Sequence, residues 1–270
     1  MPPTSTSNDR SCQLSILGPR IEISGYYDIT QFRRLVGAIR ELTVDRGYLD
    51  IILDFTNCTF THAPPMLALA TATEYYRENK IDFELILPDD KNLNRLFCNS
   101  NWAHLIEPDA YPHSEFTSPV HQPALRYRTS DEQHRIVDDI LNKILASITD
   151  FNRSHFKAIE WSINEITDNV LVHSESARGG LIQLTSFKNK KRVEFVVCDS
   201  GIGIPKSLKS SGLKIGSDVD ALAKAIEQGV TRDKSIGQGN GLYSDLSLKS
   251  RGDRYFVRLR FQLEIAFVFF

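Results

Sequence analysis

Cysteine is scarce in this chain, and no two cysteines stand in a CxxC pair. The four of them are scattered along the sequence: Cys12, Cys58, Cys98 and Cys198. Zinc sites and disulfide frameworks need cysteines at short, regular spacings, so neither is indicated. Cys58 and Cys198 lie in apolar, strand-like runs and are interpreted as small core residues. This usage fits the reducing cytoplasm.

Long apolar runs and an excess of positive charge are also missing. No run approaches the roughly 20 apolar residues of a membrane helix, and the start, MPPTSTSNDR, lacks the apolar core of a signal peptide. The formal net charge is −2, and no basic patch with interleaved aromatics occurs. We therefore expect a cytoplasmic protein that binds neither membrane nor nucleic acid. The polar residues at its start are expected to form a disordered tail over residues 1–11.

The chain does contain enough apolar material for two domains, because 41% of its 270 residues are hydrophobic and 24% are charged. In its first part, strands and helices alternate. The expected strands are 13–17, 20–24, 48–55 and 83–87, and the expected helices are 29–46, 66–79 and one that begins at 93. The alternation predicts an α/β (α+β) domain over 12–106, in which helices back a mixed sheet.

Residues 107–130 contain four prolines among polar residues, which is typical of a semi-rigid linker. The second domain, 131–270, opens with a helix whose apolar stripe includes Ile136, Ile140 and Ile144, and Ser130 or Asp131 is expected to cap it.

The sequence NEITDNVLVHS, at 164–174, is the first of three segments that carry chemistry. Glu165, Asn169 and His173 recur every four residues, so a helix places them on one face. A carboxylate and an amide one turn apart can hold a water and a metal ion. Alone, this spacing is more often a solvated helix face, and His173 is interpreted as a structural partner of the helix.

The second segment, CDSGIGIP at 198–205, follows an apolar run that predicts a buried strand over 193–198. Asp199 stands at the strand end, where a carboxylate can accept a hydrogen bond from an exocyclic amine. Gly201 and Gly203 have no side chains to block a ligand. Alone, this pattern describes a turn.

The third segment, GQGNGLY at 237–243, alternates glycine with other residues before an apolar pair. Gly237, Gly239, Gly241 and Leu242 predict a flexible loop that leads into a helix start, where backbone N–H groups can meet phosphate oxygens. The segment lacks the lysine and hydroxyl residue of a P-loop.

Taken together and in this order, the three segments resemble the N, G1 and G2 boxes of the GHKL ATPases, the superfamily that includes gyrase and the histidine kinases. The resemblance covers about residues 131–260. It implies a Bergerat α/β sandwich, with helices on one face of a mixed sheet, that binds ATP and Mg²⁺. By the same resemblance Glu165 is the catalytic base, Asn169 ligates Mg²⁺ and Asp199 contacts the adenine amine. The remaining implied nucleotide contacts are Gly201, Gly203, Arg232, Gly237, Gly239, Gly241 and Leu242, with an ATP lid over 206–236.

The first domain resembles a STAS domain, the fold of anti-sigma factor antagonists. The resemblance rests on ISGYYDI at 23–29 and ILDFTNCTFTHAPPMLALA at 52–70. Where phosphorylation-switched members have an acidic residue and an acceptor serine, this chain has His62 and Ala63, although Thr59 and Thr61 lie nearby. The domain is therefore expected to dock a protein partner rather than to report phosphate, or to pack against or dimerise the ATPase.

Three functions remain open from the sequence. The chain is an anti-sigma-type kinase that phosphorylates Ser or Thr of an unknown partner protein, an ATPase switch that closes a lid or forms a homodimer, or a non-catalytic docking scaffold. A histidine kinase is disfavoured, since the sequence after His134 lacks the acidic residue and the proline of an acceptor box. The stretch 253–270 also lacks the glycine and threonine with which GHKL domains usually close.

Overall fold

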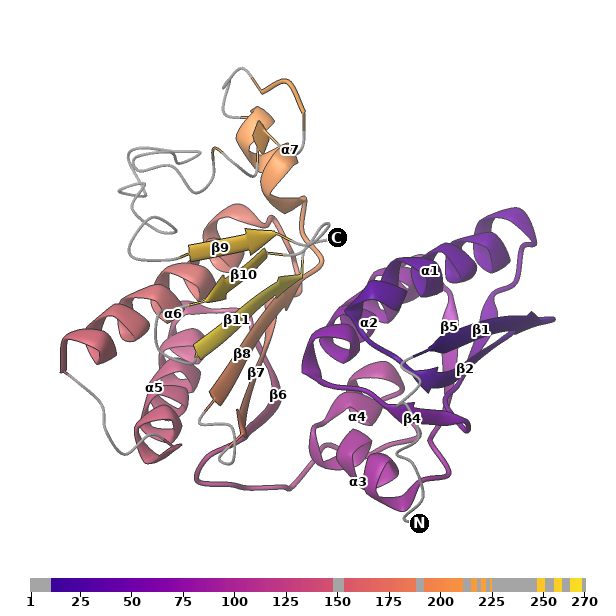
Figure 1. Cartoon of the computed structure of the whole chain (residues 1–270). Helices are drawn as coiled ribbons and strands as arrows, with labels where there is room; N and C mark the ends of the chain where they lie inside the picture. Colours follow the sequence, from indigo (N-terminus) through magenta and orange to yellow (C-terminus); the bar gives the residue numbers. More distant parts are fainter. Residues whose placement is uncertain are drawn as a thin grey trace, which may run out of the picture. The chain divides into compact units, whose positions relative to one another are not determined.

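The computed structural model describes residues 11–147, 153–187, 192–210, 215–217, 220–221, 224, 247–250, 255–258 and 263–268. The chain divides into two compact units, Met1–Ser114 and Glu115–Phe270. Each unit combines a mixed sheet with helices, which confirms the expected fold class at the level of α/β architecture (Figure 1). No helix of the described residues is long and apolar enough to cross a membrane.

The first unit is built on a five-stranded sheet. Strands β1 (Cys12–Leu17) and β2 (Arg20–Tyr26) form an antiparallel hairpin, and β2 continues in parallel with β3 (Asp50–Asp54) and β4 (Cys58–Phe60). Strand β5 (Asp82–Ile86) pairs with β3, also in parallel. Of the predicted tail 1–11, only Ser11 is described, and its carbonyl accepts a hydrogen bond from the Tyr26 N–H at 2.9 Å.

Helices of the first unit follow the apolar spacing of the sequence. Helix α1 (Ile29–Arg40) is capped by Asp28 and runs into a short π-helical turn, η1 (Glu41–Asp45). Helix α2 (Ala63–Glu78) has two prolines in its first turn, which are tolerated there because the first helical N–H groups have no intrahelical partner. Helices α3 (Lys91–Asn99) and α4 (Trp102–Ile106) close the unit. The sequence analysis did not predict β4 or α4. Strand β4 has only three residues and helix α4 only five, and such short elements leave no clear periodicity in the sequence.

The second unit contains a six-stranded sheet in the order β6-β7-β8-β11-β10-β9. Its strands are β6 (Gln122–Tyr127), β7 (Gly180–Phe187), β8 (Arg192–Asp199), β9 (Ser247–Ser250), β10 (Tyr255–Arg258) and β11 (Leu263–Val268). Strand β8 pairs antiparallel with β7 and parallel with β11. Helices α5 (Ser130–Ser147) and α6 (Arg153–His173) run side by side along one face (Figure 1).

Strand β6 corrects the predicted linker over 107–130. Pro123 lies within this strand, and the register of β6 against β7 shifts between Gln122 and Leu125. Proline cannot donate to a sheet ladder, so it is tolerated at an edge strand with a bulge, and β6 is the edge of this sheet. The predicted cap is corrected as well, because the Thr129 hydroxyl accepts the hydrogen bond from the Glu132 N–H at 3.2 Å.

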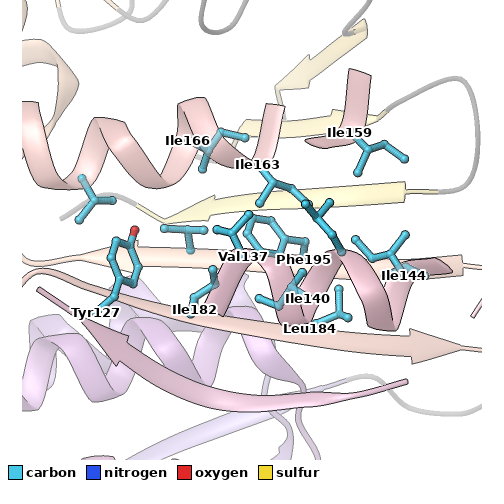
Figure 2. Close-up of a cluster of buried hydrophobic side chains, with 14 residues drawn as sticks. Tyr127, Val137, Ile140, Ile144, Ile159, Ile163, Ile166, Ile182, Leu184 and Phe195 are labelled. Carbon is cyan, nitrogen blue, oxygen red and sulfur yellow. The ribbon is translucent and has the colours of Figure 1, made fainter. Parts of the chain in front are cut away.

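The core of the second unit lies between the two helices and the sheet. Ile159, Ile163 and Ile166 of α6 project toward Phe195 of β8, and α5 contributes Val137, Ile140 and Ile144 (Figure 2). These positions are fully or almost fully buried. Since both helices bury one apolar stripe, their orientation relative to the sheet is fixed by this packing.

We expect that Phe195→Ala will lower the free energy of unfolding of the second unit by about 3–5 kcal/mol, because it opens a cavity at the centre of this core. Urea unfolding followed by hydrogen exchange of β7 and β8 peptides would isolate this unit, since two units can unfold separately. Leu145→Ala, at a side chain that is 44% exposed, is the control and should cost well under ~1 kcal/mol. Equal effects of the two substitutions would contradict this description of the core.

Candidate functional site

The second half of α6 carries the first group of candidate residues. Ile159, Ile163, Ile166 and Val170 bury one stripe of the helix against the sheet. Glu165 and Asn169 follow one another at a spacing of four residues on the flank of that stripe, and both are half-buried. The predicted helix and the shared face are thus present, with the carboxylate one turn before the amide.

Burial and the neighbouring Asp168 set the protonation of Glu165. Burial raises the pKa of the Glu165 carboxyl above its ordinary value, and the carboxylate of Asp168 raises this pKa further. Burial also raises the pKa of Asp168, whereas His134 of α5 opposes that rise. A carboxylate with a raised pKa is a stronger base, which suits Glu165 for accepting a proton.

Asp199 stands at the carboxyl end of β8 and is only 5% exposed. Its Oδ1 accepts a hydrogen bond from the N–H of Gly201 at 2.8 Å. No hydrogen bond to its Oδ2 is found among the described residues. Burial raises the pKa of this carboxyl to about 6, although the Gly201 N–H lowers it. At neutral pH the group is therefore ionised, with one oxygen held by the backbone and the other open to a donor.

The glycines of the Asp199 turn are required by the fold itself. A Cβ on Gly201 would overlap the carbonyl oxygen of Ser174, and it would lie 2.5 Å from the Ser174 Cβ. Gly203, at the start of helix α7 (Gly203–Ser210), has a φ of 72°, a conformation that side chains disfavour. The sequence interpretation explained both glycines by ligand access, whereas close helix contact and backbone conformation already demand them.

Hydrogen bonds join the end of α6 to the Asp199 turn. The N–H of Ile202 donates to the Ser174 carbonyl at 2.7 Å, and the hydroxyls of Ser176 and Ser200 lie 3.4 Å apart. Two of the three predicted segments are therefore neighbours in space, although about 25 positions separate them in the chain. The arrangement places the helix that carries Glu165 and Asn169 beside the strand end that carries Asp199.

The remaining predicted site residues lie outside the described residues: Arg232, Gly237, Gly239, Gly241 and Leu242. Most of the predicted lid, 206–236, lies outside them too. At the start of the predicted lid, Lys206 and the following residues up to Ser210 belong to α7. Pro205 near the start of α7 explains this helix, because proline favours the first helical turn.

Sequence reasoning missed Ser174, Ser176 and Ser200, which hold the two segments together. Their signal was weak, because serines after a helix are common in any loop. It also missed Asp168, whose charge acts on Glu165 although it is not on the four-residue spacing.

In the first unit, the position of the STAS-type switch is the start of α2. His62 is the N-cap residue of this helix and makes no side-chain capping hydrogen bond, and Ala63 is its first residue. Thr61 is 2% exposed, so its hydroxyl is not accessible to a kinase, whereas Thr59 is exposed. The start of α2 therefore has no hydroxyl at the position where phosphorylation-switched STAS domains have their acceptor serine.

A comparison with family models, with curated proteins and with solved structures found no match to this chain. Among the described residues, no group of three or more His, Cys, Asp or Glu side chains could hold a metal ion.

We expect the stability of the wild type to fall, relative to Asp199→Asn, as the pH rises from 4 to about 6. The folded protein binds a proton at Asp199 more tightly than the unfolded chain does, and this advantage is lost once the pH passes about 6. The loss would be on the order of 3 kcal/mol at most. Urea unfolding of both proteins between pH 4 and 8 measures it, and parallel pH profiles would show that Asp199 is not buried in this way.

Proposed function

We propose that the second unit binds Mg-ATP and that the chain is a regulatory switch protein, which transfers the γ-phosphoryl group of ATP to a serine or threonine of a partner protein. The observation that carries this proposal is the placement of a buried, half-satisfied carboxylate, Asp199, beside a helix that presents Glu165 and Asn169 on one flank. The resemblance of the sequence to the GHKL ATPases and to STAS domains supports the same conclusion.

Asp199 is suited to recognise adenine. The adenine amine is a hydrogen-bond donor, and the open Oδ2 of the ionised carboxylate is an acceptor. Because Oδ1 is held by the Gly201 N–H, the carboxylate cannot rotate freely, so its second oxygen is already oriented. A buried acceptor of this kind discriminates strongly, because a base that presents an acceptor instead of a donor leaves the carboxylate unpaired.

Asn169 fits a magnesium site in which the phosphate oxygens of a bound nucleotide supply most of the ligands. Mg²⁺ prefers oxygen ligands and usually takes only one or two from the protein, the others coming from phosphate and water. When bound, Mg²⁺ would neutralise the charge of the phosphate oxygens. The Asn169 side-chain oxygen would hold the ion at the α6 flank, one turn from Glu165.

Glu165 would accept the proton of the attacking hydroxyl. Its half-buried carboxyl, with a pKa raised by burial and by Asp168, is a stronger base than an exposed glutamate. The same carboxylate could also accept a proton from water, so ATP hydrolysis is the alternative reaction. In that case nucleotide would drive lid closure or dimerisation of the chain.

The first unit is proposed as the part that docks the protein substrate or a regulator. Its STAS-like sequence lacks an acceptor hydroxyl before α2, and the buried Thr61 does not replace it. A docking unit that is not itself switched by phosphate fits a kinase whose substrate is another protein.

Isothermal titration calorimetry with Mg-ATP tests the proposed nucleotide site. Asn169→Ala and Asp199→Asn should each weaken binding by at least tenfold. In the latter variant, the amide oxygen would stay with the Gly201 N–H, so the NH₂ group would face the adenine amine, and two donors would oppose one another. The control is Asn164→Ala on the same helix, because the Asn164 side chain donates to the Glu160 carbonyl and lies off the candidate flank. No binding by the folded wild type would refute the nucleotide site.

Glu165→Gln should retain Mg-ATP binding within about threefold and lose at least 100-fold in turnover, because the amide keeps the shape but cannot accept the proton. Turnover is measured with γ-labelled ATP in the presence of cell extract. Label on a protein supports the kinase, and free phosphate without labelled protein supports the ATPase. Unchanged turnover of the variant would show that Glu165 is not the base.

A further inference from the structure

Three serines form a continuous hydrogen-bonded connection, here termed the serine bridge, between α6 and the turn after β8. The Ser174 hydroxyl donates to the carbonyl of Val170, and it accepts a hydrogen bond from the Ser176 N–H at 3.0 Å. The Ser174 carbonyl accepts from the Ile202 N–H at 2.7 Å. The third member, Ser200, contacts the Ser176 hydroxyl at 3.4 Å.

The serine bridge ends beside the two parts of the candidate site, Asn169 and Asp199. The carbonyl of Val170 accepts the hydrogen bond from the Ser174 hydroxyl, and Val170 follows Asn169 directly in the chain. Ser200 and Gly201 follow Asp199 directly, and the Gly201 N–H holds its carboxylate. A displacement of the Asp199 turn must therefore move the end of α6, or break hydrogen bonds of a serine that is only 6% exposed.

The close approach of Gly201 to Ser174 adds a steric contact to these hydrogen bonds. No atom can be added to Gly201 without overlap with the Ser174 carbonyl, so the two backbones are already in contact. The Ser176 hydroxyl also donates to the Gly179 carbonyl at 3.0 Å, which anchors the loop between α6 and β7. The Val170 carbonyl also accepts a hydrogen bond from the Ser174 N–H at 3.4 Å, so both the backbone and the side chain of Ser174 are tied to the end of α6.

We propose that the serine bridge is a positioning device that couples recognition of the base at Asp199 to recognition of the metal-bound phosphates at Asn169. Binding at either end holds the shared connection in the geometry that the other end needs, so the two parts of the nucleotide bind cooperatively. This inference rests on the proposed ATP site. It adds Ser174 and Ser176 as positioning residues, which act through Asp199 and Asn169 and need not touch the nucleotide.

The test separates the nucleotide into two probes, adenosine and Mg-tripolyphosphate, and measures the affinity for each by NMR titration in the absence and presence of the other. In the wild type, each probe should raise the affinity for the other by at least fivefold, a typical size for coupling between sites. In Ser174→Ala this factor should fall to below twofold. Ser174→Thr, which keeps a hydroxyl, should restore most of it.

Ser162→Ala is the matched control. Ser162 lies on the same helix and is 1% exposed, but its hydroxyl has no hydrogen-bond partner among the described residues. A general effect of removing a buried serine hydroxyl from α6 would appear in both alanine variants, whereas the coupling should change only in Ser174→Ala. If Ser174→Ala keeps the wild-type coupling factor, the inference is overturned.

A second variant keeps the test valid if Ser174→Ala does not fold. Ser176→Ala removes the hydroxyl contacts to Gly179 and Ser200 from a half-buried position, and it should reduce the coupling factor at least twofold. An unchanged factor in this variant would then overturn the inference. If the folded wild type binds ATP and both probes but shows no coupling, the inference fails alone. If it binds none of them, the proposed function fails and the inference falls with it.

Discussion

The contact between the end of α6 and the turn after β8 is the constraint on which the candidate site depends. It requires a glycine at position 201, because any side chain there would overlap the Ser174 carbonyl. It also fixes where Asp199 lies, since the Gly201 N–H holds the carboxylate from within the same turn. The core with Ile163 and Phe195 orients α6 relative to β8. The contact between Ser174 and the turn after β8 then brings the ends of the two elements together.

A buried carboxylate at this position is costly to the fold. Its raised pKa shows that burial disfavours the charged form more than the single backbone N–H favours it. Such unfavourable arrangements are found mainly where a ligand or a reaction uses them. In the proposed site, a donor from adenine would add a hydrogen bond to Oδ2, so part of the cost to the free protein would be recovered on binding.

The sequence allowed a large part of this architecture to be predicted. The helix face with Glu165 and Asn169 followed from the four-residue spacing, and the strand before Asp199 followed from an unbroken apolar run. Strand β6 was missed because Pro123 and the flanking prolines are typical of a linker, while the pairing with β7 at the sheet edge depends on residues more than 50 positions away.

The serine bridge could not be predicted for a related reason. Its hydrogen bonds join Ser174 and Ser176 to a turn about 25 residues later, and nothing in the local sequence distinguishes these serines from ordinary loop serines. Gly201 gave an ambiguous signal, because a glycine needed for helix contact and a glycine needed for ligand access look the same in the sequence.

A crystal structure of the chain with Mg²⁺ and a non-hydrolysable ATP analogue tests the central claim most directly. We predict that the adenine amine will lie within hydrogen-bond distance of Asp199 Oδ2, and that the metal ion will be coordinated by Asn169 and phosphate oxygens. A nucleotide bound elsewhere, with water in place of adenine at Asp199, would contradict the account.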